Sequence, residues 1–404
     1  MTDSYAFLRP LLAANRAWVA IDWQNSALES IDSDSLTQLF NEAGAGALAD
    51  KIPFVLPASP EWLGKTGLIQ KFTAKQVIFA LPSSTLETPE AIRQCILLRQ
   101  EGYHFALRTD NAEIIKQIPV AAFDYLQIDA GFARHQLRAL DLSYTSDAGF
   151  RRIATGVDAH ELFDWLAARN FEVFDSRFVT VLDPFADKKP DLTRLKLLKL
   201  LSLVAQDADT REIEEIFREE PKLSYNLLRL VNSVAVGAKT TIGSFQQAIA
   251  ILGRRQLQRW LQLLIYADQL AKSSEPNPLM QLAAARGRQM ELLIAAIEPA
   301  IKPSQDLPEP ADTAFMTGIF SLLDVLLNMP MAEILEALPF QAAIRDALDA
   351  KRGLLGQLLN AIIAGETGEF TAAATILAAH GISPARHAKA QAAALLWASK
   401  INLD

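Results

Sequence analysis

Acidic residues end several short apolar runs of this chain, and carboxylates in such places could hold a metal ion. The run YLQID ends on Asp129, and the run WVAID ends on Asp22. Hard cations such as Mg²⁺ prefer oxygen ligands, and many barrel enzymes bind a metal ion with a carboxylate at a strand end. Such enzymes usually place a lysine just before that carboxylate. The preceding polar residue is Gln127, which leaves two hypotheses: a working metal site and the remains of one.

The runs that carry these residues alternate with helical segments in the first half of the chain, such as residues 88–102 and 158–170. The β-type runs cover residues 18–22, 54–56, 77–81, 105–109, 125–129, 152–157, 171–175 and 177–182. This alternation predicts a parallel sheet covered by helices, and eight strands allow a closed (β/α) barrel. Because this part of the chain is short for a complete barrel, we expect an incomplete or distorted one with missing helices.

The strand pattern ends at a proline-marked segment, LDPFADKKPD, which is typical of an interdomain linker. After it, apolar residues recur at helical spacing. We therefore expect an α/β domain over residues 1–182, a linker over 183–192 and an all-α domain over 193–404. Helices are predicted before residue 271 and also over residues 278–300, 311–329, 331–338, 340–364, 369–380 and 384–400.

Two strings of the helical half resemble a known family. EEPKLSYNLLRLVNSVAVG and SFQQAIAILGRRQLQRW, both inside residues 197–265, are similar to the core of an HDOD domain. Residues 315–340 and 354–370 resemble the C-terminal part of that domain in the version fused behind an EAL barrel. The chain as a whole resembles the EAL–HDOD, or YuxH-like, signalling proteins of bacteria. This resemblance implies a degenerate EAL barrel followed by a helical HDOD domain with an HD-GYP-like fold.

Active EAL domains hydrolyse cyclic di-GMP with two metal ions, and the resemblance places their motif residues on positions of this chain. Asp22, Asp129 and Asp158 keep a carboxylate near the expected places. At the other motif positions, the residue of this chain differs in type from the residue of active EAL domains. These positions are Leu56 or Pro57, Ala80, Arg108 and Thr109, Gln127, Thr155, and Asp175 with Ser176. Asp110 carries a carboxylate one position late.

Too few acidic groups remain on these positions to hold two dications. Arg108 adds a fixed positive charge where a bridging carboxylate would stand, and an arginine repels a metal ion at that range. We therefore expect no catalytic residues, no metal and no cofactor. The remaining aspartates have two interpretations, as helix N-caps and strand-end turn residues or as vestigial ligand contacts.

An HD-type phosphohydrolase needs an adjacent His-Asp pair and further histidines to hold its metal ions. The histidines of the chain are His104, His135, His160, His380 and His387, and none lies between residues 161 and 379. Asp324 stands near the place expected for the pair, but Leu323 precedes it. We expect His380 and His387 to be surface residues rather than ligands.

Two further places are weaker candidates. Cys95 lies in the helical run RQCILLRQ and is interpreted as a packed residue rather than a nucleophile. Arg255 and Arg259 share one helix face beside Trp260. They form either a solvated face with a core tryptophan or a docking surface for an acidic partner.

The composition of the chain limits the cellular location and the kinds of binding partner that we expect. The chain has 404 residues, a formal net charge of −8 and one cysteine. The acidic balance argues against general nucleic-acid binding. We see no signal peptide and no apolar run long enough for a membrane helix, so we expect a cytoplasmic protein.

The resemblance and the missing ligands together favour a non-catalytic signal-transduction scaffold of the cyclic di-GMP type. Its expected partners are proteins of a signalling pathway, such as EAL, GGDEF or regulator proteins, in the control of motility, biofilm or surface attachment. The alternatives are a metal-independent receptor for cyclic di-GMP and a residual cyclic di-GMP phosphodiesterase.

Overall fold

The structure is a computed structural model that divides into two compact units. Unit 1, the barrel unit, comprises Met1–Val181, Gly365–Ala374 and Ser383–Ala393. Unit 2, the helical unit, comprises Leu182–Ala364, Thr375–Ile382 and Ala394–Asp404. The structure describes residues 4–26, 33–64, 71–184, 276–297, 309–338 and 340–401, with single residues at 69, 209, 247, 259, 260, 262–264 and 266.

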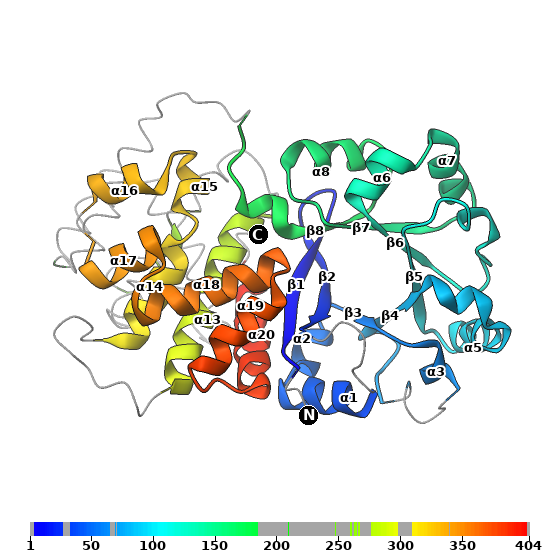
Figure 1. Ribbon diagram of the computed structural model, residues 1–404, viewed down its shortest axis with the longest axis horizontal. Coiled ribbons are helices and arrows are strands. Elements are labelled where there is room, and N and C mark those ends of the chain that lie inside the picture. Colours follow the sequence, from blue (N-terminus) through cyan, green and yellow to red (C-terminus); the bar gives the residue numbers. More distant parts are fainter. Residues whose placement is uncertain are drawn as a thin grey trace. The chain divides into compact units, whose positions relative to one another are not determined.

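Eight strands close into a barrel in chain order, as Figure 1 shows. They are β1 (Ala6–Ala13), β2 (Trp18–Asn25), β3 (Phe54–Pro57), β4 (Val77–Pro82), β5 (His104–Thr109), β6 (Tyr125–Asp129), β7 (Arg151–Thr155) and β8 (Val173–Asp175). The pairs from β2 to β8 are parallel, whereas β1 runs antiparallel to both β2 and β8. The prediction of an α/β barrel followed by a helical region is confirmed, and its departure from regularity lies in this reversed first strand.

Two strand predictions need correction. Strand β1 was missed because its sequence, AFLRPLLA, contains a proline and no β-branched residue. The run over residues 177–182 was predicted as a strand, but residues Ser176–Thr180 form a 3-10 helix, η3. The Asp175 carboxylate accepts a hydrogen bond from the Arg177 backbone N–H at 3.1 Å. This local side-chain cap favours a helical turn over an extended ladder.

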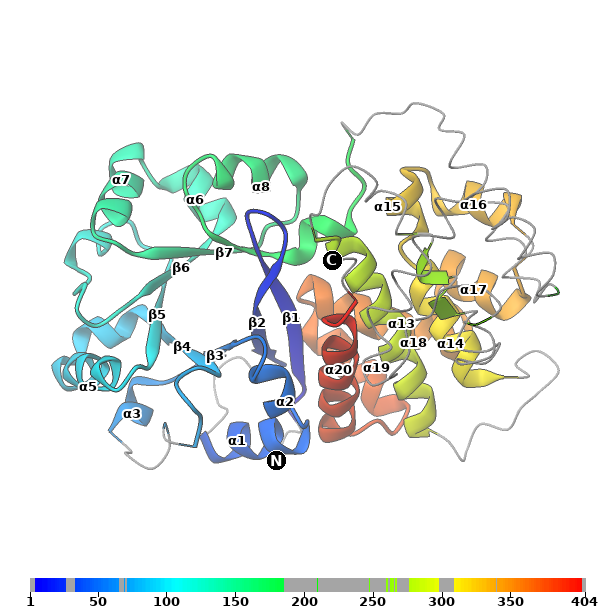
Figure 2. The ribbon, with the colours of Figure 1, turned by 180° about the vertical axis from the view of Figure 1, so that it is seen from behind.

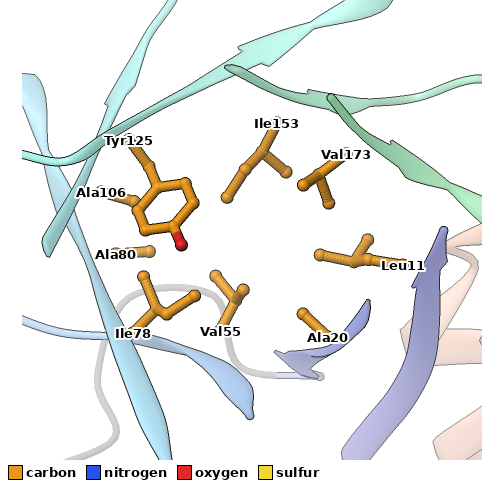
Figure 3. Close-up of a cluster of buried hydrophobic side chains, with 9 residues drawn as sticks. All are labelled: Leu11, Ala20, Val55, Ile78, Ala80, Ala106, Tyr125, Ile153 and Val173. Atoms are coloured by element: carbon orange, nitrogen blue, oxygen red, sulfur yellow. The ribbon is translucent and has the colours of Figure 1, made fainter. Parts of the chain in front are cut away.

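Small and branched side chains fill the interior of the barrel, as Figure 3 shows. Tyr125 is the one aromatic residue of this cluster, and Ala80, where the resemblance places a metal-binding glutamate, belongs to it with an exposed fraction of 2%. The barrel therefore has a packed core rather than a pore, and open space is left at its mouth.

Helices surround the ring of strands in both ribbon views (Figures 1 and 2). They are α1 (Ser33–Glu42), α2 (Gly46–Ala49), α3 (Pro60–Leu63), η1 (Ser83–Glu87), α5 (Pro89–Gln100), η2 (Ile115–Gln117), α6 (Ala130–Gln136), α7 (Ala139–Asp147) and α8 (His160–Ala167). The predicted helices over 88–102 and 158–170 correspond to α5 and α8. Several of the others have only three to five residues, as expected for a short barrel chain.

Four of the six helices predicted after residue 277 match described helices within a few residues, whereas the predicted helices over 311–329 and 340–364 are each divided into two. In the second case, Lys351 and Gly353 adopt a positive φ at the junction of the two helices. The described helices after residue 277 are α13 (Pro278–Ile297), α14 (Pro310–Phe320), α15 (Leu323–Leu327), α16 (Met331–Ala337), α17 (Ala342–Ala350), α18 (Gly353–Thr367), α19 (Phe370–Ala379) and α20 (Pro384–Ala398). Most of the predicted linker, residues 185–192, and the helices predicted between residues 194 and 258 lie outside the described residues, apart from Asp209 and Gln247.

One stretch of the described residues, Pro310–Leu327, has the length and composition to cross a membrane. It spans α14 and α15, and 72% of it is buried in the protein. A core helix of a bundle has the same properties, so this stretch is weak evidence for a membrane span.

Two late segments of the chain pack on the outer edge of β1 within the barrel unit. Strand β8 pairs with Leu11, Leu12 and Ala13 only. The Gln391 side chain, on α20, bonds to the backbone at Leu8: its Oε1 accepts from Leu8 N at 2.9 Å, and its Nε2 donates to Leu8 O at 3.2 Å. The amide thus satisfies backbone groups that no strand covers.

Candidate functional site

A cavity of about 500 Å³ opens at the mouth of the barrel. Its walls come from the carboxyl ends of the parallel strands, from β1 and from the segment after α18. They comprise Arg9, Asp22, Gln24, Pro82, Ser83, Arg108, Thr109, Asp110, Gln127, Asp129, Thr155, Gly156, Asp175, Arg177, Gly368 and Phe370. The sequence analysis therefore located one wall of this cavity, because Asp22, Arg108, Gln127, Asp129 and Thr155 do meet there.

Arg9 is the most enclosed cation of the cavity. It stands opposite Asp22 in the β1–β2 register, and its side chain is 11% exposed. Its Nη2 lies 3.8 Å from Asp22 Oδ2, and its Nη1 lies 3.3 Å from Asp175 Oδ2. One guanidinium therefore neutralises carboxylates from two strands.

Arg177 holds Asp175 from the other side. Its Nε donates to Asp175 Oδ2 at 3.0 Å, and Asp175 also accepts from the Gly156 N–H at 3.2 Å. Asp175 is 1% exposed, so nearly all its acceptor capacity faces these donors. Two arginines and a backbone amide satisfy this buried carboxylate.

Asp22 is the other buried carboxylate, with an exposed fraction of 2%. Burial raises the pKa of Asp22, while Arg9 and the hydrogen bond from Gln24 Nε2, at 2.8 Å, act in the opposite direction. Desolvation at the cavity wall lowers the pKa of Arg108, and the charge of Asp22 opposes that shift. Arg108 thus contributes positive charge beside Asp22, as the sequence predicted.

Asp129 is a helix N-cap. Its Oδ1 accepts from Phe132 N at 2.9 Å at the start of α6, which confirms the structural interpretation of this residue. Its Oδ2 faces Gly156, where a Cβ would lie 2.6 Å away. Gly156 has a φ of +70°, so both its backbone conformation and the space beside Asp129 require glycine.

Some of the remaining motif positions lie on the wall of the cavity, and others lie outside the cavity. Gln127 lines the cavity, and its Oε1 is buried without a hydrogen-bond partner. Thr155 donates to the Ile128 carbonyl at 3.5 Å. Asp158 is exposed in the loop between β7 and α8 and does not line the cavity, and the N-cap of α8 is Ala159. Asp158 is therefore neither the cap of α8 nor a wall residue of the cavity.

No three His, Cys, Asp or Glu side chains among the described residues are grouped so that they could hold a metal ion. In the helical unit, Asp324 lies in the first turn of α15 and is partly buried, and burial raises its pKa. Its Oδ1 accepts a hydrogen bond from the Val325 N–H at 2.9 Å. The position expected for the HD pair is thus occupied by a helix-starting aspartate.

The proposed docking surface at Arg259 and Trp260 is wrong for these two residues. Arg259 Nη2 lies 2.6 Å from Asp312 Oδ1 and also bonds to Glu291, and the side chain of Arg259 is 14% exposed. Trp260 is 6% exposed and packs near Trp397. Both belong to the interior of the helical unit, and Arg255 lies outside the described residues.

The surface assignment of His387 is also wrong. It is 1% exposed, its ring lies 5.1 Å from that of Phe7, and burial lowers its pKa to about 4. His380 is half-buried and bonds to Gln357 at 2.7 Å. The interpretation of Cys95 is confirmed, because it is fully buried and burial raises its pKa to about 12.

Sequence reasoning missed Arg9, Arg177, Gly368 and Phe370 as parts of the site. Arg9 had one signal: it is the only charged residue in the apolar run AFLRPLLA, and a charge there needs a buried partner. Gly368 and Phe370 follow Arg9 by more than 350 residues, and no local pattern links them to the barrel.

Comparison with known proteins decides the family of the second half. A family model described as HDOD domain matches residues 192–360. The chain contains an HDOD domain. A closed eight-stranded barrel precedes this HDOD domain.

Two curated relatives are similar to the chain. YuxH of Bacillus subtilis, which is uncharacterized, is 25% identical over 295 residues, which are 70% of this chain and 69% of YuxH. The cyclic di-GMP phosphodiesterase CdgJ of Vibrio cholerae is 26% identical over 211 residues, which are 52% of this chain and 46% of CdgJ. The match thus spans about half the length of CdgJ.

Solved EAL structures resemble the barrel at low sequence identity. The EAL domain protein of Listeria monocytogenes has a TM-score of 0.33 and 12% identity, covering 43% of this chain and 85% of that one. The FimX EAL domain of Xanthomonas citri, in complex with cyclic di-GMP, has a TM-score of 0.35 and 12% identity, covering 44% and 86%.

Proposed function

We propose that this chain is a non-catalytic signal-transduction protein of the cyclic di-GMP type, which acts in the cytoplasm through protein–protein interaction. The observation that supports this most directly is the pairing of Arg9 and Arg177 with Asp22 and Asp175 at the barrel mouth. In this arrangement, guanidinium groups occupy the positions beside the carboxylates that a cation would take.

Two-metal hydrolysis needs several carboxylates that converge on hard cations, which activate a water and stabilise the departing oxygen. Here Asp22 and Asp175 are buried in arginine ion pairs, and one oxygen of Asp129 accepts the hydrogen bond that caps α6. Separating a buried carboxylate from its arginine leaves an unpaired charge at a cost of about 3–5 kcal/mol. The donor set therefore does not fit a pair of dications.

The name of CdgJ supports the link to cyclic di-GMP, and it also keeps hydrolysis as the rival outcome. The test is turnover of cyclic di-GMP by the purified full chain with Mg²⁺ or Mn²⁺. We expect none above the rate of buffer, since the carboxylates are engaged by arginines. Metal-dependent turnover that Asp129→Asn abolishes would overturn the non-catalytic assignment, because that variant keeps a capping side chain and removes the charge.

A second candidate, a metal-independent cyclic di-GMP receptor, is favoured by two groups of the cavity. Arg108 has no hydrogen-bonded or ion-paired partner among the described residues, and Gln127 Oε1 is unpaired. An arginine suits a phosphate oxygen, and an amide suits a base edge. A charge-assisted hydrogen bond contributes about 1.5–3 kcal/mol, so its loss weakens binding about tenfold or more.

Calorimetry without metal ions separates this receptor from a pure scaffold. The receptor predicts saturable binding of cyclic di-GMP that Arg108→Gln weakens and Arg134→Gln leaves unchanged. Arg134 is a matched control because it is exposed in the barrel unit and pairs with Glu161 away from the cavity. A flat titration at high concentration dismisses the receptor and leaves the scaffold.

The scaffold acts through partners, for which we propose EAL, GGDEF or regulator proteins in the control of motility, biofilm or surface attachment. Because Arg259 and Trp260 are internal, charge reversal there would test folding rather than docking. The direct test is capture of partners by the full chain from its native cell, followed by mass spectrometry. A reproducible signalling partner supports the scaffold, and recovery of none in any growth condition contradicts it.

A further inference from the structure

The end of helix α18 closes part of the barrel mouth within the barrel unit. Glu366 and Thr367 are the last two residues of this helix, Phe370 begins α19, and Gly368 and Phe370 line the cavity. The Arg9 Nη1 donates to the Glu366 carbonyl at 3.0 Å, and the Arg177 Nη1 donates to the Thr367 carbonyl at 3.2 Å. The last carbonyls of a helix lack partners inside the helix, and positive charge near them is favourable.

The same two arginines hold the carboxylates of the cavity. Arg9 joins Asp22 and Asp175 to Glu366, and Arg177 joins Asp175 to Thr367. A displacement of either guanidinium would therefore change the charge balance of the cavity and the attachment of this segment together. Arg177 is the more accessible of the two, with 26% of its side chain exposed against 11% for Arg9.

Packing adds a second, uncharged contact to the same segment. The Phe370 ring stacks on Phe7 of β1 with a centroid distance of 5.0 Å. Gly365 lies so close to that ring that a Cβ would stand 2.6 Å from Phe7 Cδ1. Glycine in a helix lowers helix stability, so its presence here is explained by this approach.

We propose that residues Glu366 to Phe370 are a latch over the barrel mouth, held by Arg9 and Arg177, and that release of the latch gives access to the cavity. The other late segment is a fixed anchor, because the Gln391 amide and the buried His387 attach it to the middle of β1. This inference follows from the geometry of the mouth and stands whether or not the barrel binds or hydrolyses cyclic di-GMP.

Hydrogen exchange of the full chain tests the latch against the anchor. We expect Arg177→Gln to speed exchange of the amides from 366 to 370 about tenfold or more, while those from 387 to 391 stay within about twofold. The matched control is Arg169→Gln, because Arg169 also donates to a backbone carbonyl, that of Trp165, but away from the mouth. Unchanged exchange at 366–370 overturns the proposal, and so does an equal rise in both segments.

Thiol labelling tests whether the latch controls access. The single native thiol, Cys95, is buried with a raised pKa, so a Gln127→Cys variant adds one reporter thiol at the cavity wall, where the native side chain is 6% exposed. We add Gly365→Ala, which favours the helix but collides with Phe7, and measure the rate with a soluble disulfide reagent. An increase of about fivefold or more over Gln127→Cys alone supports the latch. An equal rate overturns it, and wild type gives the background from Cys95.

Discussion

At the scale of single residues, the barrel mouth shows how arginine can take the electrostatic place of a metal ion. Arg9 contacts Asp22 and Asp175, and Arg177 contacts Asp175 again. A guanidinium stays charged at any ordinary pH and offers several donors in one plane, so it satisfies buried carboxylates without any ion. A guanidinium cannot coordinate and polarise a water molecule as a Lewis acid does, and the proposed lack of hydrolysis depends on this difference.

Gly156 provides a test of how tightly the mouth is packed. A Cβ there would lie 2.6 Å from Asp129 Oδ2 and 3.2 Å from Arg177 Nη2, at a φ of +70°. Gly149 has a similar φ of +82° with nothing within 4 Å, so Gly149→Ala measures backbone strain alone. We expect Gly156→Ala to lower the free energy of unfolding by about 1–3 kcal/mol more than Gly149→Ala. Urea unfolding gives both values, and equal losses would contradict the crowding at Asp129.

The sequence predicted that part of the cavity wall which lies on the parallel strands. Asp22 and Asp129 could be predicted because a carboxylate that ends a β-type run stands at the carboxyl end of a barrel strand, and Gln127 precedes Asp129 on the same strand. Arg9 and Arg177 could not be predicted. Arg9 lies on β1, whose strand pattern is interrupted by Pro10, and Arg177 lies on a 3-10 helix whose sequence resembles that of a strand. Their role depends on long-range pairing, which local pattern does not encode.

At the scale of elements, regular apolar spacing in the sequence predicted helices. It did not indicate where two helices come into close contact. The span of α13 and the start of α14 were expected within a few residues, but nothing indicated that these helices touch at glycine. A Cβ on Gly318 would lie 2.6 Å from Gly287 Cα, so the two backbones are in contact. Glycine is tolerated inside these helices because burial of both apolar helices offsets its helix penalty.

The contact between α13 and α14 predicts that a glycine-to-alanine substitution inside a helix lowers stability, whereas such substitutions usually raise it. Gly318→Ala should lower the free energy of unfolding by about 1–3 kcal/mol, because the methyl group forces the two helices apart. Gly46→Ala, in α2 with nothing within 4 Å, should be neutral or stabilising by up to about 1 kcal/mol. Thermal or urea unfolding of both variants checks the contrast. Stabilisation by both substitutions would mean that α13 and α14 do not touch at this point.

At the scale of the whole molecule, the barrel unit is discontinuous in the chain. Its strands end at residue 175, yet it also includes Gly365–Ala374 and Ser383–Ala393. These segments complete β1, whose edge beyond β8 would otherwise expose backbone donors and acceptors. Both segments follow the residues 192–360 that match the HDOD domain, so the barrel unit is complete only after that domain has been synthesised.

His387 makes this closure of the barrel sensitive to pH. It is buried against Phe7 and Tyr5, and burial lowers its pKa to about 4, against an ordinary value of 6.5. A histidine with a lower pKa in the folded state takes up its proton preferentially when unfolded. The stability that it contributes is therefore complete above pH 6.5 and is lost as the pH falls toward 4.

A difference of about 2.5 in pKa corresponds to about 3 kcal/mol over that window. We expect the free energy of unfolding of the barrel unit to fall by about this amount more in wild type than in His387→Leu, which cannot take up a proton. Urea unfolding between pH 7 and pH 4, followed by tryptophan fluorescence, measures the slope, and His380→Gln serves as the control on a half-buried histidine. If wild type and His387→Leu lose stability in parallel, protonation of His387 is not what loosens the segment from β1, and the carboxylates of the barrel mouth become the groups to test.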